Sequence, residues 1–223
     1  PAGLTNPICF QVGTLPETGE QEPNTRQDPA GAAVDTPVVL NGQILPGDMD
    51  CVRLRARQGQ KLVLQAQARR LIPYLADGVP GWFQAVLALY DPKGNQVAYA
   101  DDYRGDPDPV LLYAVPADGE YTLEVRDSIY RGREDFVYRL SIGELPFVTG
   151  VFPLGGPARA KTAVQVSGWN LPTGTVVMDA TGAGPGTAML TVRRGTLISN
   201  RVPFAIDGVR DIEACVGAVV KSG

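Results

Sequence analysis

Hydrophobic residues recur at every second position in short stretches along most of the chain. Residues 61–68, 121–125 and 137–142 are clear examples, each with one apolar and one polar face. Alternation with period two predicts strands that are buried on one face. No segment carries the sustained apolar stripe at i, i+3, i+4 and i+7 that indicates an amphipathic helix. The pattern therefore predicts an all-β fold.

Turn-forming residues separate the predicted strands. The stretch Asp91-Pro92-Lys93-Gly94-Asn95 lies between two apolar runs and predicts a β-hairpin. The run before it, Ala85–Tyr90, suits a buried strand and is far shorter than the ~18 residues that a membrane-spanning helix needs. Short strands at such close spacing are typical of β-sandwiches.

The pattern changes near residue 146. Residues 151–157 are rich in Pro and Gly, and the chain beyond them is richer in Thr, Val and Gly. We place a domain boundary there, with a second unit over residues 146–208 and a tail over residues 209–223. A unit of roughly 60 residues is near the lower limit for an independent core, so we expect it to lean on its neighbour.

A motif near the start of the chain is repeated near its end. Asn and Phe recur at equal positions, with Ile or Val alternating around them, in the segments Asn6–Gly13 and Asn200–Asp207. The repeat predicts that residues 1–15 correspond to the closing strand of the second unit, so that residues 1–19 form a strand and linker resembling the end of a preceding immunoglobulin-like repeat in a tandem array. A chance likeness of two short strands is the alternative. Because the chain opens at Pro1 without a signal peptide, we expect a fragment of a larger protein.

The composition excludes several classes of function. The net charge is −4 and the sequence pI about 4.9, which disfavours a nucleic-acid surface. The chain has no histidine, so Ser-His-Asp and Cys-His catalysis and imidazole metal sites are excluded. Cys9, Cys51 and Cys215 are too few for a disulfide scaffold and leave the redox compartment open. We predict that the chain is not an enzyme.

A series of short motifs follows in order over residues 20–145: Glu20–Asn24, Asn41–Ile44, Gly47–Val52, Ala56–Gln60, Leu87–Gly94, Asp118–Val125 and Tyr138–Leu140. Taken together, these motifs resemble those of a bacterial pre-peptidase C-terminal (PPC) domain. The resemblance implies a jelly-roll-like β-sandwich of a secreted or surface protein, often beside a peptidase and not itself catalytic. Val52 departs from the family pattern, which usually has an aromatic residue there.

Residues 146–208 resemble an immunoglobulin-like IPT/TIG domain. The likeness rests on Pro146–Pro153, on Gly155-Gly156-Pro157 and on Val164–Leu171. It implies a second, smaller immunoglobulin-like β-sandwich.

Side-chain oxygens occupy every second position of the segment that enters the first unit. In an extended chain Glu20, Glu22 and Asn24 point the same way, and Asp48 and Asp50 can add oxygens from a neighbouring loop. Calcium (Ca2+) prefers six to eight such oxygens. The sequence therefore predicts a calcium site. The alternative is that the glutamates form a solvated linker and the aspartates only shape a turn.

The PPC-like collagen-binding domains of bacterial collagenases hold calcium with an acidic linker and an Asp-rich loop. By resemblance, Glu20, Glu22, Asn24 and Asp50 match that arrangement best, and Asp48 fits more loosely. Thr25 stands where the family often has an Asp, which removes one carboxylate.

Two further groups are candidates for binding. Tyr74, Trp82 and Phe83 lie in a long segment between predicted strands, and exposed aromatic rings suit sugars or proline-rich peptides. The alternative is that these rings pack against the sheet. A second acidic group consists of Asp101, Asp102, Asp106 and Asp108 and is a candidate site for an additional cation. Asp101 and Asp102 are a poor acid/base pair for hydrolysis, because neighbouring residues of a strand point to opposite faces.

Together these features predict a non-catalytic extracellular interaction or spacer module of a larger secreted or cell-surface protein, stiffened by calcium. Its partners are neighbouring domains of the same protein and a protein or polysaccharide ligand, with neither nucleic-acid binding nor membrane insertion. The alternative function is an accessory ligand-binding domain of a secreted peptidase or glycan-degrading enzyme.

Overall fold

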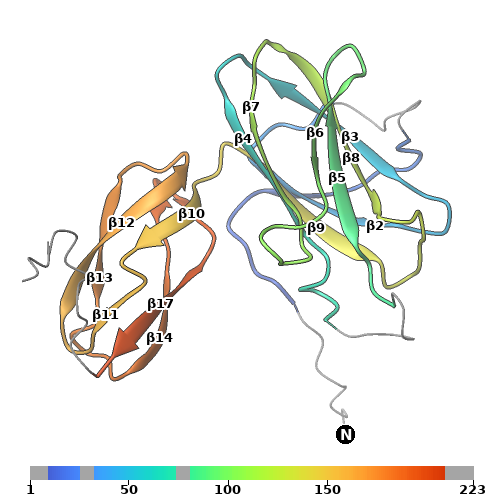
Figure 1. Cartoon of the computed structure of the whole chain (residues 1–223). Coiled ribbons are helices and arrows are strands. Elements are labelled where there is room, and N and C mark those ends of the chain that lie inside the picture. The colour runs from blue at the N-terminus through green and yellow to red at the C-terminus, as the bar shows by residue number, and fades with distance from the viewer. Residues whose placement is uncertain (1–9, 26–32, 74–80, 209–223) are drawn as a thin grey trace, which may run out of the picture. The chain divides into compact units, whose positions relative to one another are not determined.

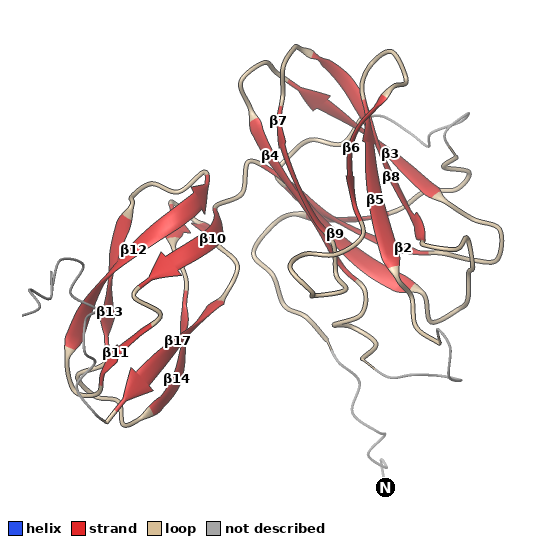
Figure 2. Cartoon of the chain, viewed as in Figure 1, coloured by secondary structure: helices blue, strands red, loops and turns tan. Residues whose placement is uncertain are grey.

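The computed structural model of the chain describes residues 10–25, 33–73 and 81–208. Every element of regular secondary structure in these ranges is a β-strand, so the all-β prediction is confirmed (Figure 2). Among the same residues, none forms a helix with the length and apolarity needed to cross a bilayer. The strands are β1 (Glu17–Gly19), β2 (Val38–Gln43), β3 (Asp50–Ala56), β4 (Lys61–Gln67), β5 (Ala85–Tyr90), β6 (Gln96–Ala100), β7 (Val110–Ala114), β8 (Gly119–Asp127), β9 (Val137–Gly143), β10 (Phe147–Phe152), β11 (Gly155–Pro157), β12 (Lys161–Trp169), β13 (Thr175–Asp179), β14 (Gly186–Leu190), β15 (Arg193–Arg194), β16 (Leu197–Ile198) and β17 (Val202–Asp207).

The contacts of the chain divide it into two compact units, one ending at Leu145 and the other starting at Pro146. Unit 1 contains a five-stranded sheet in the order β1-β2-β9-β4-β7 and a four-stranded sheet in the order β3-β8-β5-β6 (Figure 1). Apolar side chains of both sheets, among them Leu64, Leu87, Leu123 and Leu140, form one buried cluster. Unit 1 is therefore a two-layer β-sandwich.

The predicted hairpin joins β5 to β6, which pair antiparallel. Every residue of β5 is buried, as expected for a strand without a polar face. The Asp91 carboxylate shapes the turn, since its Oδ1 accepts the backbone N–H groups of Lys93 at 2.8 Å and Asn95 at 2.9 Å. Gly94 supplies the left-handed backbone that the turn requires, with a φ of 82°.

The first strand of unit 1 leads the acidic segment along one edge of the sandwich. β1 pairs parallel with β2, so residues 17–19 form the edge of the first sheet of unit 1. Further on, the carbonyl of Asn24 accepts the backbone N–H of Cys51 at 2.6 Å. The segment from β1 to Asn24 is therefore fixed at one end to the first sheet and at the other end to β3 of the second.

Unit 2 contains two three-stranded sheets, β10-β12-β13 and β11-β17-β14, and the small ladder β15-β16. Its core is a separate cluster that includes Val148, Val164, Phe204 and Ile206. The side chain of Asn200 ties the chain before β17 to β10, because it accepts the N–H of Val148 at 2.7 Å and donates to its carbonyl at 3.0 Å.

Candidate metal centre

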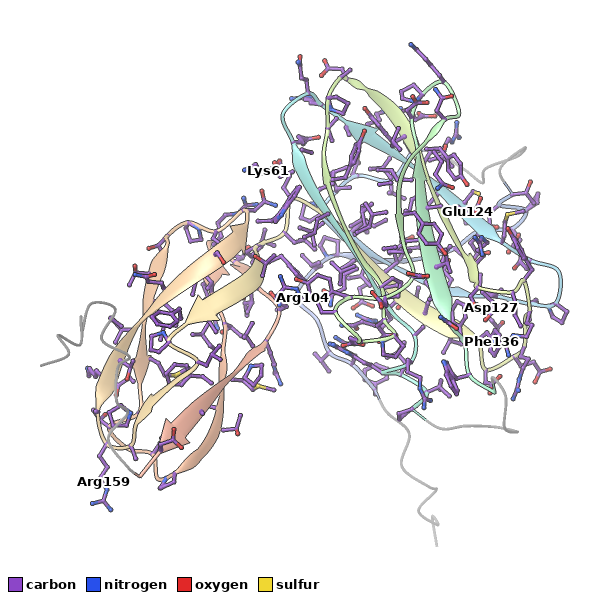
Figure 3. All side chains as sticks on the ribbon, in the orientation of Figure 1. Lys61, Arg104, Glu124, Asp127, Phe136 and Arg159 are labelled. Atoms are coloured by element: carbon purple, nitrogen blue, oxygen red, sulfur yellow. The ribbon has the colours of Figure 1, made fainter. Side chains whose placement is uncertain are left out.

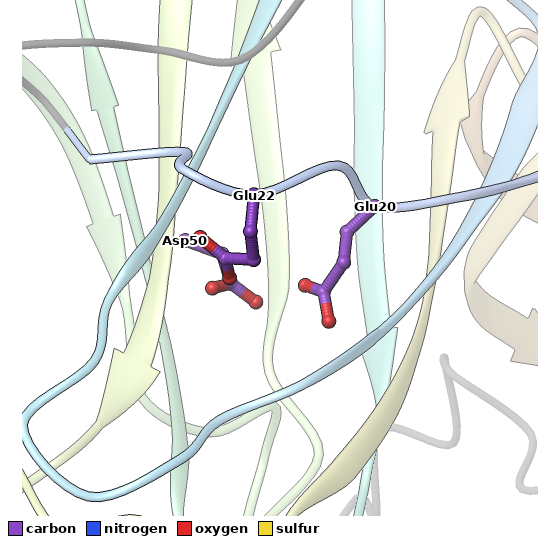
Figure 4. Close-up of side chains that lie close together, drawn as sticks. All are labelled: Glu20, Glu22 and Asp50. Atoms are coloured by element: carbon purple, nitrogen blue, oxygen red, sulfur yellow. The ribbon is translucent and has the colours of Figure 1, made fainter.

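Three carboxylates from two separate segments meet at one edge of unit 1. Glu20 and Glu22 follow β1, whereas Asp50 begins β3, and their carboxylates lie together in Figure 4. One oxygen of each lies within 4.8 Å of the others. Oxygens bound to one calcium ion at 2.3–2.6 Å are at most about 5 Å apart. The spacing therefore suits a shared cation.

Backbone pairing aligns the two glutamates. The N–H of Glu20 donates to the carbonyl of Asn41 at 3.0 Å, and its Oε1 accepts the N–H of Gln43 at 2.8 Å. These bonds hold Glu20 against β2. Because Asn24 is held in turn on β3, the segment between them is drawn across the site and presents both glutamates to Asp50.

Two buried oxygens at the site have no hydrogen-bond donor. Asp50 and Asn24 are only 2% and 3% exposed, yet Oδ1 of each lacks a partner. The backbone N–H of Asn24 donates to Oε2 of Glu22 at 3.1 Å, which places Asn24 beside the carboxylates. Leaving a buried acceptor unsatisfied costs about 1–3 kcal/mol. A bound cation would satisfy both oxygens.

The environment raises the pKa of two carboxyl groups of the site, those of Asp50 and Glu22. Burial raises the pKa of Asp50 to about 9, helped by its hydrogen bond with Glu20 and by the charges of Glu20 and Asp48, while the hydrogen bond from Tyr138 opposes the shift. Partial loss of solvent, followed by the charges of Asp48 and Glu20, raises the pKa of Glu22. The site thus carries more negative charge than its surroundings stabilise.

Asp48 contributes to the site through its charge. It lies in the loop between β2 and β3, and its Oδ1 accepts the N–H of Met49 at 2.9 Å. Its charge raises the pKa of both Glu22 and Asp50. The structure therefore brings together the residues that the sequence predicted, with Glu20, Glu22 and Asp50 at the centre and Asn24 and Asp48 beside them.

The donor set fits a hard cation. All candidate ligands are oxygens, which suit calcium or magnesium and not the nitrogen and sulfur sites of zinc. In the described part of the chain, none of the ion pairs involves Glu20, Glu22 or Asp50. Two unit charges 4.8 Å apart repel by about 3 kcal/mol at an effective dielectric constant of ~20. A divalent cation would remove this repulsion.

Two residues of the site were not predicted from the sequence. The Tyr138 hydroxyl lies 2.6 Å from Oδ2 of Asp50 and 3.2 Å from Oε2 of Glu20. Gly42 leaves room for this arrangement, since a Cβ there would lie 2.3 Å from the Tyr138 hydroxyl and 2.5 Å from Oε2 of Glu20. The alternation over residues 137–142 could have indicated Tyr138, because a tyrosine on the core face needs an acceptor for its hydroxyl.

Two members of the second acidic group, Asp106 and Asp108, bind groups of the protein itself. Asp108 is buried, and its carboxylate accepts the backbone N–H groups of Ala68 at 3.0 Å, Arg69 at 2.7 Å and Arg70 at 3.1 Å. Asp106 forms an ion pair with Arg70. These carboxylates hold the turn after β4.

The aromatic residues predicted to bind a ligand differ in their exposure. Phe83 is 5% exposed and stacks on Phe136, with ring centroids 5.1 Å apart, so it belongs to the core and does not face a ligand. Trp82 is half-buried, and the guanidinium carbon of Arg69 lies 5.0 Å from its ring centroid. Tyr74 lies outside the described residues.

A different loop exposes large apolar side chains. Ile129 and Tyr130, after β8, are 59% and 61% exposed. Asp127, which is completely buried and labelled in Figure 3, holds this loop by accepting the N–H groups of Ile129 at 3.1 Å and Arg131 at 3.2 Å. The guanidinium of Arg126 lies 4.5 Å from the centroid of the Tyr130 ring. The tip is therefore fixed by its own contacts.

Comparisons with known proteins identify solved structures only. No model of a protein family matches the chain, and no curated protein matches it. One similar structure is the pre-peptidase C-terminal domain of a collagenase from Bacillus anthracis, with 14% identity, a TM-score of 0.33, and coverage of 60% of this chain and 99% of that one. Another is PliG, a periplasmic inhibitor of g-type lysozyme from Salmonella Typhimurium, with 21% identity, a TM-score of 0.31, and coverage of 58% of this chain and 98% of that one.

Proposed function

We propose that this chain is a non-catalytic extracellular spacer and interaction module that binds calcium at the entry to unit 1. In this proposal unit 1 is a PPC-like jelly-roll domain and unit 2 an immunoglobulin-like module of the IPT/TIG type. The ligands are the carboxylates of Glu20, Glu22 and Asp50, joined by Asn24 Oδ1 and Asp48.

One observation carries the proposal. Acidic side chains converge within 4.8 Å while two buried oxygens beside them, on Asn24 and Asp50, have no donor. The alternative from the sequence, in which the glutamates form a solvated linker and Asp48 and Asp50 only shape a turn, supplies no partner for these two oxygens. Their burial favours a site that is built for a cation.

The mechanical consequence follows from where the ligands lie. Glu20 and Glu22 belong to the segment that leads into unit 1, whereas Asp50 belongs to β3. A cation that joins them fixes the entering chain to the sandwich, and the like charges that would otherwise push the segment away are neutralised. Calcium would therefore stiffen the entry to the module, which suits a domain that holds others apart.

Thermal unfolding with and without calcium tests this proposal. The intact chain, freed of metal with a chelator, should melt at a higher temperature when calcium is added, because a ligand that binds only the folded state stabilises it. Glu22→Gln should remove most of the increase. Glu134→Gln, at an exposed carboxylate outside the cluster, is the matched control and should keep it.

A second candidate function is an accessory domain that binds a protein or polysaccharide for a secreted peptidase or glycan-degrading enzyme. The exposed pair Ile129 and Tyr130, held on the loop that Asp127 fixes, favours it. Ordered apolar side chains at a loop tip form anchors at little entropic cost on binding.

An array of collagen-like peptides and polysaccharides tests the second candidate. Binding that is lost in the double variant Ile129→Ser with Tyr130→Ser, and kept in Tyr99→Ser, would locate the face on this loop. Tyr99 is a suitable control because it is also exposed, at 48%. Absence of binding to every probe would leave the spacer function alone.

A further inference from the structure

Phe10 and Val12 are the most exposed large hydrophobic residues in the described part of the chain, at 88% and 86%. They lie two positions apart, so their side chains point the same way when the backbone is extended. Gln11 between them is polar. This is the pattern of a strand with one buried face, yet neither apolar side chain is covered by unit 1.

The same pattern occurs in β17, where it is buried. Phe204 and Ile206 are 1% and 6% exposed and belong to the core of unit 2, while Ala205 between them is exposed. The likeness extends upstream in the sequence, where Leu4-Thr5-Asn6 corresponds to Ile198-Ser199-Asn200. The apolar residues Ile8, Phe10 and Val12 thus correspond in sequence to Val202, Phe204 and Ile206 of β17.

The structure of unit 2 shows what this pattern does. β17 is the central strand of its sheet, parallel to β11 and antiparallel to β14. The hydroxyl of Ser199 accepts the N–H of Val192 at 2.8 Å, and Asn200 bonds to both backbone groups of Val148. The Ser-Asn pair positions the chain, and the alternating Phe and Ile then close the core.

We propose that the segment containing Phe10 and Val12 is the closing strand of another immunoglobulin-like sandwich built like unit 2, with its remaining strands outside residues 1–223. The partner is a sandwich that lacks the strand equivalent to β17, so that its sheet has a gap between the strands equivalent to β11 and β14. Phe10 and Val12 fill its core as Phe204 and Ile206 fill that of unit 2. This interaction is independent of the calcium site.

A strand graft within the complete chain tests the fit. Residues 198–207 are replaced by the sequence of residues 4–13, which keeps Phe204 and changes the apolar core positions of β17 only by Val202→Ile and Ile206→Val. The buried Ser199 becomes Thr, which keeps a hydroxyl at that position. Of the remaining β17 changes, those at Pro203 and Ala205 fall on exposed positions, and Asp207→Gly falls on a partly exposed one. In the control graft the same sequence is shifted by one residue, which turns its apolar face outward.

Nuclear magnetic resonance spectra of unit 2 report the result. The in-register graft should keep the dispersed amide signals of unit 2 and lower its melting temperature by less than about 10 °C, whereas the shifted graft should lose those signals. If the in-register graft unfolds unit 2, or if both grafts fold equally well, the proposal is overturned.

A second measurement uses the natural β17. Phe10→Ser with Val12→Ser should leave the melting of the intact chain unchanged within about 1 °C. A clear loss of stability would show that these side chains pack within this protein, and it would overturn the proposal.

Discussion

The hydroxyl of Tyr138, on β9, lies 2.6 Å from Oδ2 of Asp50, on β3, and so links the two sheets of unit 1 beneath the candidate calcium site. Burial raises the pKa of Tyr138 well above its usual value, as do the charges of Asp50 and Glu20, so the hydroxyl stays protonated and donates a hydrogen bond. The contact supports the folded sandwich and fixes one carboxylate of the site.

Tyr138→Phe should destabilise the metal-free chain. The substitution removes the donor to a buried carboxylate, for which we expect a loss of about 1–3 kcal/mol in the free energy of unfolding. Chemical denaturation in the presence of a chelator measures it. The control is Tyr99→Phe, at an exposed ring, and an equal effect of the two substitutions would contradict the structural role of the Tyr138 hydroxyl.

The pH dependence of stability should change in Asp50→Asn. Folding raises the pKa of Asp50 to about 9 from an unfolded value of about 3.9, so between these pH values the folded state holds a proton that the unfolded state has lost. The contribution of Asp50 to the free energy of unfolding therefore falls as the pH rises through that window.

Asp50→Asn cannot titrate and lacks this fall. We therefore compare the free energies of unfolding of the variant and the natural chain without calcium. The value for the variant minus that for the natural chain should increase steadily between pH 5 and pH 8 (roughly the middle of the window). Denaturant titrations at several pH values measure the difference. A difference that is independent of pH would show that Asp50 is already charged in the folded metal-free state.

Gly42→Ala should weaken calcium binding. The added methyl group would overlap the positions of the Tyr138 hydroxyl and of Oε2 of Glu20, so one of them must move. We expect at least about a tenfold loss of affinity, equal to ~1.4 kcal/mol. Gly19→Ala is the control, because nothing lies within 4 Å of a Cβ there. Calorimetric titration that gives both variants the natural affinity would contradict the geometry of the site.

Asp127→Ala should destabilise unit 1 at neutral pH and lose its effect in acid. Burial opposes ionisation of Asp127, but hydrogen bonds from Arg131 and from backbone N–H groups outweigh it and lower the pKa. A lowered pKa gives stability that is present above the unfolded value near 4 and is lost as pH falls through the folded value.

The expected loss at pH 7 is about 3 kcal/mol, since Arg131 is left without its buried partner. Asp135→Ala removes a more exposed pair with Arg133 and should cost less than about 1 kcal/mol. Denaturation at pH 7 and near pH 3 separates the two. Equal losses at both pH values would rule out ionisation of Asp127 as the cause.

The strands and the common side of Glu20, Glu22 and Asn24 could be predicted because both depend on local periodicity, whereas the resemblance to PPC domains implied the approach of Asp50. The alternation at residues 121–125 and 137–142 determines which side chains face the core, and the two-residue spacing of Glu20, Glu22 and Asn24 determines their common side. Pairing across the sandwich has no such local signal. Gly42 and Tyr138 join the site only because β2 pairs with β9, with Gly42 opposite Tyr138.

The aromatic residues were harder to predict for the same reason. Phe83 lies next to Trp82 in the sequence, but only tertiary packing shows that it stacks on Phe136. The exposure of Tyr130 likewise depends on the hydrogen bonds of Asp127, which no spacing in the sequence indicates. Composition and pattern identified the residue types, and long-range contacts decided which of them are available.

Calorimetric titration of calcium into the intact, chelator-treated chain measures whether the carboxylates of Glu20, Glu22 and Asp50 bind the ion. We expect saturable binding of one ion per chain with a dissociation constant of about 1 mM or tighter, at least about tenfold weaker binding in Glu22→Gln, and unchanged binding in Glu134→Gln. Absence of binding at ~10 mM calcium, or equal binding by the natural chain and Glu22→Gln, would contradict this expectation.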